Sequence, residues 1–329
     1  MGYRKEKEKI EAQIRKIKLI GLFVLLAIFL AVSIFSAFCP PFTWKYYVKK
    51  PDVTKRGNGE LRIHFLDVGQ ADSILIELPD GKVALIDGGL ATDTSEKAIL
   101  RHLNALKIKT IDYLIVTHTD SDHCGGLKRV LECKNVLNAY LPATNAQDAG
   151  EAYAGFYQQL LEEDCAMHHA KRGLSMGNGA YTFVFLAPYQ EAVEEDATTE
   201  ETSLVVWLDY QGVSALFAGD AEATEEELLV RDAQLGLFDN LGVELSSTEI
   251  LKVSHHGSAY SSFLSFLHYL NVEVGVVSCG ENNAYGHPAE ATVENFATVG
   301  ADLFRTDKDG TVIVTVKPDV GYGVKTLKK

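Results

Sequence analysis

The most informative stretch of the chain is residues 113–126, which read YLIVTHTDSDHCGG. An apolar run typical of a buried β-strand ends at Thr117, and a Gly pair then opens a helix. Between them lie four possible metal ligands: His118, Asp120, Asp122 and His123. Four such groups in one turn would repel one another or lack hydrogen-bond partners unless a cation lay among them. A helix N-cap needs only one Asp, so the pattern predicts a metal site, and its mixed ligands favour Zn²⁺ or Mn²⁺ over Ca²⁺.

Short apolar runs that end in polar or Gly-rich residues recur along the rest of the chain. They predict strands at 61–66, 73–78, 83–86, 113–117, 181–186, 204–208, 214–218, 250–253, 272–277 and 311–316. Helical periodicity occurs at 95–106, 125–131, 149–161, 222–230, 261–270 and 289–298. This mixture predicts an α/β body of two sheets with helices outside, formed by residues 60–329 as one domain.

Further motifs follow in a fixed order. They are DVGQADS at 67–73, IDGG at 86–89, LFAGD at 216–220, LKVSHHGS at 251–258 and NAYGHP at 283–288. With H-x-D-x-D-H-x-G-G at 118–126, the series resembles the signature of the metallo-β-lactamase superfamily, in the variant where Asp replaces the second His. It looks like the extracellular hydrolase domain of the ComEC/Rec2 competence proteins, over about residues 61–316. The resemblance implies an αββα sandwich of two mixed sheets.

The resemblance also implies ligands for two divalent cations, Zn²⁺ or Mn²⁺. The first cation would take His118 and Asp120, the second would take Asp122, His123 and His255, and Asp220 would bridge them. Either histidine of the adjacent pair can be the ligand. We expect His255, because it comes first after the strand, and we expect His256 to contact substrate or to orient a ligand.

One family ligand is missing. The superfamily usually has a third histidine for the first cation between the two ligand motifs, but residues 198–204 read TTEETSL. The Asn that competence-type domains commonly place there is absent too. The first site is therefore expected to be rich in oxygen ligands, which favours Mn²⁺ or a loosely held Zn²⁺.

Two cations roughly 3.5–4 Å apart would activate a bridging water for attack on a phosphorus or carbonyl centre. Asp120 or Asp122 would orient this water, and His287 would protonate the leaving group unless it only braces the turn before Pro288. We expect Asn283 and Tyr285 to donate hydrogen bonds to a phosphoryl oxygen, and Asp87 to hydrogen-bond a metal-binding histidine. Asp72 would either hold the His287 loop or form a simple turn. Lys252 would either contact phosphate or lie on a solvated face of its strand.

The N-terminal residues predict a membrane anchor. Residues 19–38 form a run of twenty without a charged side chain, which as a helix spans the roughly 30 Å hydrocarbon layer. The run ends in SAFCPP and lacks the Ala-x-Ala exit of a cleaved signal, so we expect an uncleaved anchor over a lipoprotein or cleaved form. Seven basic residues precede the run and five follow it, which places residues 1–18 in the cytoplasm and the body outside. Residues 39–59 then form a linker.

Charge bears on the substrate. Residues 1–50 carry 10 Lys+Arg and 3 Asp+Glu. Residues 51–329 therefore carry the remaining 21 Lys+Arg and 42 Asp+Glu, a net charge of −21. The resemblance suggests DNA or RNA, but polyanion binding normally rests on clustered Lys and Arg. A small phosphodiester is as plausible, and the choline-phosphate esterases of teichoic acid provide an alternative enzyme. Because one family ligand is missing, the alternative to an enzyme is a membrane-tethered binding module whose metal centre is degenerate.

Overall fold

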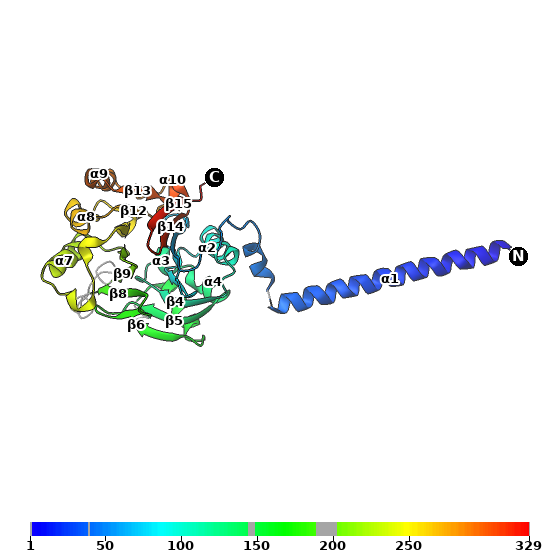
Figure 1. Ribbon diagram of the computed structural model, residues 1–329. Coiled ribbons are helices and arrows are strands. Elements are labelled where there is room, and N and C mark those ends of the chain that lie inside the picture. Colours follow the sequence, from blue (N-terminus) through cyan, green and yellow to red (C-terminus); the bar gives the residue numbers. More distant parts are fainter. Residues whose placement is uncertain (1, 39, 144–148, 189–202, 329) are drawn as a thin grey trace. The chain divides into compact units, whose positions relative to one another are not determined.

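The computed structural model describes residues 2–38, 40–143, 149–188 and 203–328, which fall into two compact units, Met1–Val48 and Lys49–Lys329. The first unit contains helix α1 (Gly2–Phe38) and a short 3-10 helix (Pro41–Tyr46) (Figure 1). The apolar part of α1 is exposed all round, with Phe23 64% and Phe29 71% accessible. A helix that is apolar on every face is typical of a membrane span or a signal sequence. α1 is long and apolar enough to cross a membrane.

Among the described residues, the second unit holds fifteen strands in two sheets. The first sheet runs in the order β15 (Gly321–Thr326), β14 (Val312–Lys317), β1 (Leu61–Phe65), β2 (Ile74–Glu77), β3 (Val83–Ile86), β4 (Thr110–Ile115), β5 (Asn135–Leu141), β6 (Ala166–His169). The second runs in the order β13 (Asp302–Arg305), β12 (Val274–Val277), β11 (Ile250–Lys252), β10 (Val213–Phe217), β9 (Val205–Tyr210), β8 (Tyr181–Ala187), β7 (Ser175–Gly177). Each sheet contains both parallel and antiparallel pairs.

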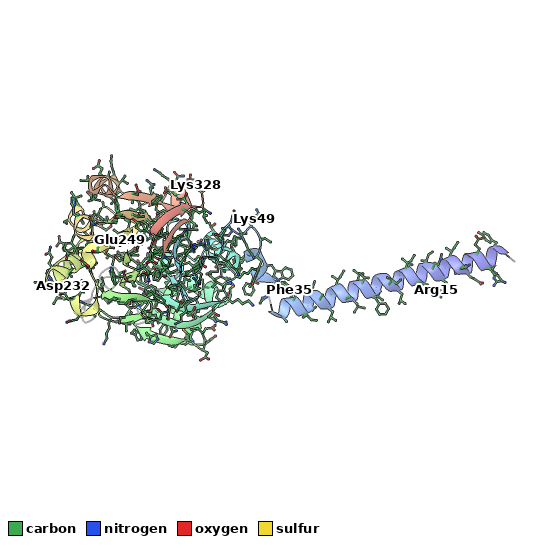
Figure 2. All side chains as sticks on the ribbon, in the orientation of Figure 1. Arg15, Phe35, Lys49, Asp232, Glu249 and Lys328 are labelled. Carbon is green, nitrogen blue, oxygen red and sulfur yellow. The ribbon has the colours of Figure 1, made fainter. Side chains whose placement is uncertain are left out.

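Apolar side chains fill the space between the two sheets. Figure 2 draws the side chains of the described residues on the ribbon. Phe65 and Val314 enter this core from the first sheet, and Phe185 and Phe217 enter it from the second. Full burial of a side chain of this size stabilises the fold by about 1.5–3 kcal/mol. Alternate residues of a strand share one face, so Leu61, Ile63 and Phe65 of β1 all point into this core.

Helices cover the outer faces of the sheets. Figure 1 shows α2 (Asp93–Ala105) and α4 (Leu127–Leu131) on one side of the strands and α7 (Ala223–Gln234) and α8 (Leu264–Leu270) on the other. The other α-helices in the described part of this unit are α3 (Ser121–Cys124), α5 (Glu151–Leu160), α9 (Glu290–Val299) and α10 (Thr306–Asp309). A second core packs α7, α8 and α9 against the second sheet through Leu229, Phe266 and Phe296. Two mixed sheets between helices confirm the predicted fold class.

The sequence pattern did not predict five of the strands, namely β5, β6, β7, β13 and β15. Four of them, β6, β7, β13 and β15, lie at sheet edges. Edge strands pair on one side only and bury little, so β6, β7 and β15 have no fully buried residue in their ranges and lack a strong alternating pattern.

Parallel pairing places the motifs that contain His and Asp at the carboxyl ends of neighbouring strands. β3 and β4 are parallel neighbours, as are β10, β11 and β12. Asp87 follows β3, His118 follows β4, Asp220 follows β10, and the pair His255 and His256 follows β11. Because parallel strands end at the same edge of a sheet, residues far apart in sequence meet there.

Candidate metal centre

The ligand loop after β4 packs backbone to backbone on the loop after β3. Gly88 N donates a hydrogen bond to His123 O (2.6 Å), and Gly126 N donates one to Gly89 O (2.8 Å). A Cβ atom on Gly126 would lie 2.2 Å from Gly88 O, a distance that no side chain tolerates. The Gly pairs of both motifs are thus needed for this close approach, which places His123 beside Asp87.

Asp220 lies at the middle of the histidine cluster. Its Oδ1 is 3.3 Å from His123 Nε2, and its Oδ2 is 3.8 Å from His118 Nε2 and 3.7 Å from His256 Nε2. His256 Nε2 is in turn 3.3 Å from Asp122 Oδ2. The structure therefore brings together the predicted ligands His118, Asp122, His123 and Asp220, although they come from two separate stretches of the chain.

Within the part of the chain that the structure describes, the atoms that face one another in this cluster have no hydrogen-bond partner. They are the Nε2 atoms of three histidines and one carboxylate oxygen, namely His118, His123, His256 and Asp220 Oδ1, all of them buried. Buried polar atoms without partners are costly and rare. Ligand atoms of His118, His123 and Asp220 lie within 4.8 Å of one another, as do those of Asp122, His123 and His256. Imidazole nitrogens and carboxylate oxygens at this spacing fit a Zn²⁺ or Mn²⁺ centre.

The two adjacent histidines lie differently. The His256 side chain is 3% exposed, and its Nδ1 is bonded to Ser278 O (2.9 Å), which turns Nε2 toward Asp122 and Asp220. The His255 side chain is 26% exposed, with Nε2 3.6 Å from Asp220 Oδ2 and Nδ1 2.9 Å from Glu222 Oε1. Both residues have a positive φ, 45° and 53°, so their side chains leave a tightly turned backbone in different directions. Sequence spacing contains no signal for this turn.

The other predicted site residues lie at the rim of the cluster. Asp120 is half-buried, and its carbonyl accepts hydrogen bonds from His123 N and Cys124 N. The His287 ring lies 5.8 Å from the His255 ring and 6.5 Å from the His256 ring.

The loop before His287 is held by the Asn283 amide. Its oxygen accepts hydrogen bonds from Tyr285 N (3.2 Å) and His287 N (2.9 Å), and its nitrogen donates to His287 O (2.6 Å) and to Gly280 O (3.0 Å). The Tyr285 side chain is left 73% exposed, with its ring 5.7 Å from the His287 ring. An exposed aromatic face thus stands on a well-braced loop next to the cluster.

Asp87 orients His123. Its carboxylate oxygen Oδ2 is 2.8 Å from His123 Nδ1, and Thr117 donates to the same carboxylate from both its backbone N–H (2.8 Å) and its hydroxyl (2.6 Å). A carboxylate on Nδ1 keeps the proton there and leaves Nε2 to face Asp220. The position of Asp87 at the end of β3 agrees with the supporting role expected from the sequence.

Asp72 and Lys252 form a buried ion pair behind the cluster. Lys252 Nζ is 2.7 Å from Asp72 Oδ2, and both side chains are almost completely buried. Both sequence interpretations of Lys252, a phosphate contact and a solvated face, are therefore wrong, because its strand β11 lies inside the second sheet. The Asp72 carboxylate faces Lys252, His123 and His256 rather than the His287 loop, which was one of the two roles considered for it. Gln70 contacts this loop instead, since its Oε1 accepts from Gly280 N (3.0 Å).

The pKa values in the cluster follow its alternating charges. Burial, together with the nearby His123, lowers the pKa of His118 to about 3. Although burial opposes the shift, the carboxylates of Asp220 and Asp87 raise the pKa of His123 well above its usual value. Burial also opposes the shift at Asp122, where the nearby imidazoles of His256 and His123 lower the pKa to about 2. Ionised carboxylates thus lie beside the His123 imidazole, which attracts a proton, and a cation must compete with that proton.

The missing family histidine falls at 198–204, of which residues 198–202 lie outside the described residues. Ser203 is described, and its hydroxyl accepts a hydrogen bond from Asp220 N (3.3 Å). The end of this segment therefore reaches the cluster.

Comparisons with known proteins agree with this geometry. The family model described as the metallo-beta-lactamase superfamily matches residues 66–281. The chain is 28% identical to ComE operon protein 3 of Bacillus subtilis over 279 residues, 80% of this chain and 34% of that protein. It is 29% identical to competence protein ComA of Neisseria gonorrhoeae over 256 residues, 77% of this chain and 32% of that protein. The chain thus spans about a third of the length of these relatives.

Solved structures show the same fold. The crystal structure of CmlA, a diiron β-hydroxylase from Streptomyces venezuelae, superposes with a TM-score of 0.50 at 14% identity, over 83% of this chain and 55% of that one. At this identity the likeness concerns the fold alone.

Proposed function

Because the chain belongs to the metallo-β-lactamase superfamily and is related to the competence proteins, we propose that it is a metal-dependent hydrolase of phosphodiesters, most simply a nuclease. The observation that carries the proposal is the convergence of three unpartnered histidine nitrogens on the carboxylate of Asp220. Such a donor set suits two divalent cations, Zn²⁺ or Mn²⁺, that share one carboxylate.

Each cation would have its own ligands. The first would be held by His118, Asp120 and Asp220, and the second by Asp122, His123, His256 and Asp220. His256 replaces His255 in this assignment because its Nε2 is buried and faces both Asp122 and Asp220. When bound, the cations would lower the pKa of a water molecule and neutralise the charge that develops on a phosphoryl oxygen.

The residues around the cations would position the reactants. Asp87 keeps His123 in the tautomer that presents Nε2, and Asp122 would accept a hydrogen bond from the attacking water. His287 stands at the open rim, where it would donate a proton to the leaving alkoxide. Tyr285 next to it would contact the substrate.

Two observations bear on the substrate. The exposed Tyr285 ring favours a substrate with nucleobases, because every base can stack on an aromatic face. The net charge of −21 on residues 51–329 opposes a long polyanion and favours a small phosphodiester, such as a choline-phosphate ester, as the second candidate.

A substrate panel tests this function. The full chain in detergent, loaded with Mn²⁺ or Zn²⁺, is incubated with single-stranded DNA, duplex DNA, RNA and bis-p-nitrophenyl phosphate, with Asp220→Ala as the control for contaminating nucleases. We expect cleavage of at least one polynucleotide and of the small ester, both lost on chelation. Cleavage of the ester alone would reject the nuclease, and no turnover by fully loaded protein would leave the binding module as the better account.

We also propose that residues 19–38 form an uncleaved anchor, with residues 1–18 in the cytoplasm and the hydrolase body outside. The excess of basic residues before the apolar run supports this orientation. Protease added to intact cells is then expected to digest the body while a tag fused to the N-terminus stays protected. A body that survives until the cells are lysed would contradict the orientation.

A further inference from the structure

Helix α7 begins three residues after Asp220, and its N-cap Glu222 and its first turn bring two carboxylates to the loop that carries the adjacent histidines. Glu222 Oε1 is 2.9 Å from His255 Nδ1. Glu226, one helical turn further on, is 1% exposed and turns toward the same loop, residues 254–263. One helix thus connects the central carboxylate to the segment that supplies His256.

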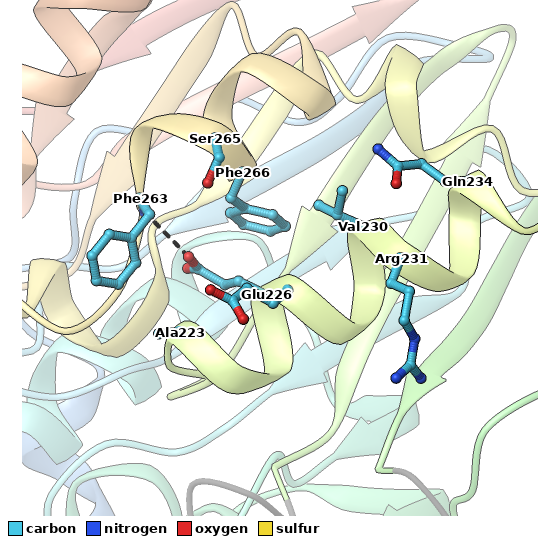
Figure 3. A pocket seen from close by; sticks show the side chains of 9 residues that line it. Ala223, Glu226, Val230, Arg231, Gln234, Phe263, Ser265 and Phe266 are labelled. Atoms are coloured by element: carbon cyan, nitrogen blue, oxygen red, sulfur yellow. Dashed lines mark hydrogen bonds between the residues drawn. The ribbon is translucent and has the colours of Figure 1, made fainter.

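The Glu226 carboxylate joins the two ends of this loop. Its Oε1 accepts hydrogen bonds from Ser254 Oγ (2.8 Å) and Ser262 N (2.6 Å). Its Oε2 accepts one from Phe263 N (3.2 Å), which Figure 3 shows as a dashed line. Ser254 directly precedes the histidine pair, whereas Ser262 and Phe263 end the loop. Glu226 therefore fixes where the loop starts and where it returns.

The loop needs such support because its backbone is strained. His255, His256 and Ser262 have φ values of 45°, 53° and 55°, in the left-handed region that residues with a Cβ seldom adopt. Conformations of this kind persist only where the surroundings hold them. The hydrogen bond from Ser261 Oγ to Ser254 O (2.9 Å) closes the loop on itself, and Glu226 ties it to the helix.

The chemistry of Glu226 fits this role better than a role in core packing. Its three hydrogen-bond partners are a hydroxyl and two backbone N–H groups, none of them charged. Burial of a carboxylate with only neutral partners is costly, so a smaller or neutral residue would serve packing better. A carboxylate is an acceptor at both oxygens, whereas the NH₂ group of glutamine would face an N–H or O–H donor.

We propose that Glu226 is a positioning residue for the metal centre. It holds loop 254–263 in the conformation that directs His256 Nε2 toward Asp122 and Asp220. The inference rests on the proposed metal centre and is independent of the substrate.

A neighbouring residue provides a matched control. Glu226, Glu227, Phe263 and Phe266 line one cavity of about 300 Å³ between α7 and α8 (Figure 3). Glu227 is exposed on the same helix, so Glu227→Gln removes the same charge from a residue that faces solvent. The cavity leaves room for small rearrangements in either variant.

The test compares Mn²⁺ binding by the full chain and its Glu226→Gln and Glu227→Gln variants, followed by the electron paramagnetic resonance signal of free Mn²⁺. We expect Glu226→Gln to weaken one of two binding events by about 10- to 100-fold, as for other residues that orient metal ligands, and Glu227→Gln to leave both within about twofold. Turnover lost by Glu226→Gln is expected to return at saturating Mn²⁺, which a simple loss of folded protein would not allow.

Wild-type Mn²⁺ affinity in folded Glu226→Gln would overturn the inference. If that variant does not fold, Ser254→Ala replaces it, because this change removes one of the three hydrogen bonds and keeps Glu226. Ser254→Ala is expected to weaken Mn²⁺ binding by several fold. Unchanged Mn²⁺ affinity in this variant would equally overturn the inference. A wild-type chain that binds no Mn²⁺ would instead contradict the proposed metal centre itself, so the two failures are distinguishable.

Discussion

Replacement of His256 by alanine is expected to weaken binding of the second cation by about 10²- to 10³-fold. A four-ligand zinc site binds with about 10–16 kcal/mol, so one ligand accounts for roughly 2.5–4 kcal/mol, and each 1.4 kcal/mol is a factor of ten. His256 qualifies as such a ligand because its buried Nε2 lies 3.3 Å from Asp122 Oδ2 and 3.7 Å from Asp220 Oδ2 and has no hydrogen-bond partner among the described residues. His255 is more exposed and is bonded to Glu222, so its replacement by alanine is expected to weaken cation binding by about tenfold or less.

Competition with a chelator of known affinity measures both variants under the same conditions. His255→Ala serves as the matched control, because it removes the same imidazole from the next position of the same loop. A larger loss of affinity in His255→Ala than in His256→Ala would show that the ligands are assigned the wrong way round.

The second prediction concerns Asp220. Its carboxylate oxygens lie within 3.3–3.8 Å of nitrogens of all four neighbouring histidines: His118, His123, His255 and His256. Alanine there removes the carboxylate that both cations would share and leaves the histidines without the negative charge between them. Cation stabilisation of the transition state is worth several kcal/mol, so we expect turnover to fall by about 10³-fold or more.

Asp164→Ala, at an exposed position away from the cluster, provides the control for this variant and is expected to keep wild-type turnover. Rates are measured on whichever phosphodiester the wild-type chain cleaves. An Asp220→Ala protein that is folded and turns over at wild-type rates would show that the carboxylate has no part in the reaction.

The sequence predicts the fold and most of the cluster because the informative signals are local. Apolar runs that end in His, Asp or Gly mark strand ends. Parallel pairing then brings Asp87 and His118 together at the edge of the first sheet, and it brings Asp220 and His256 together at the edge of the second. The Gly pairs beside Asp87 and His123 signal the close contact of two loops. For these residues, neighbours along the chain contain enough information to place the side chain.

Other features depend on tertiary packing and leave no local signal. The directions of His255 and His256 follow from two consecutive left-handed residues, a conformation that their sequence does not favour. Glu226 lies in a helix segment rich in glutamates, where a carboxylate is normally expected to face water, yet it is buried against the ligand loop. Lys252 interrupts an apolar strand, and only the position of Asp72, from a distant turn, explains its burial.

The central claim is that one cluster holds two cations that share Asp220. Its most direct test is the metal content of the full chain, measured by mass spectrometry after loading with Mn²⁺ and removal of unbound metal. The account predicts about two ions per wild-type chain and a clear loss in Asp220→Ala. Fewer than about one ion per wild-type chain would contradict it.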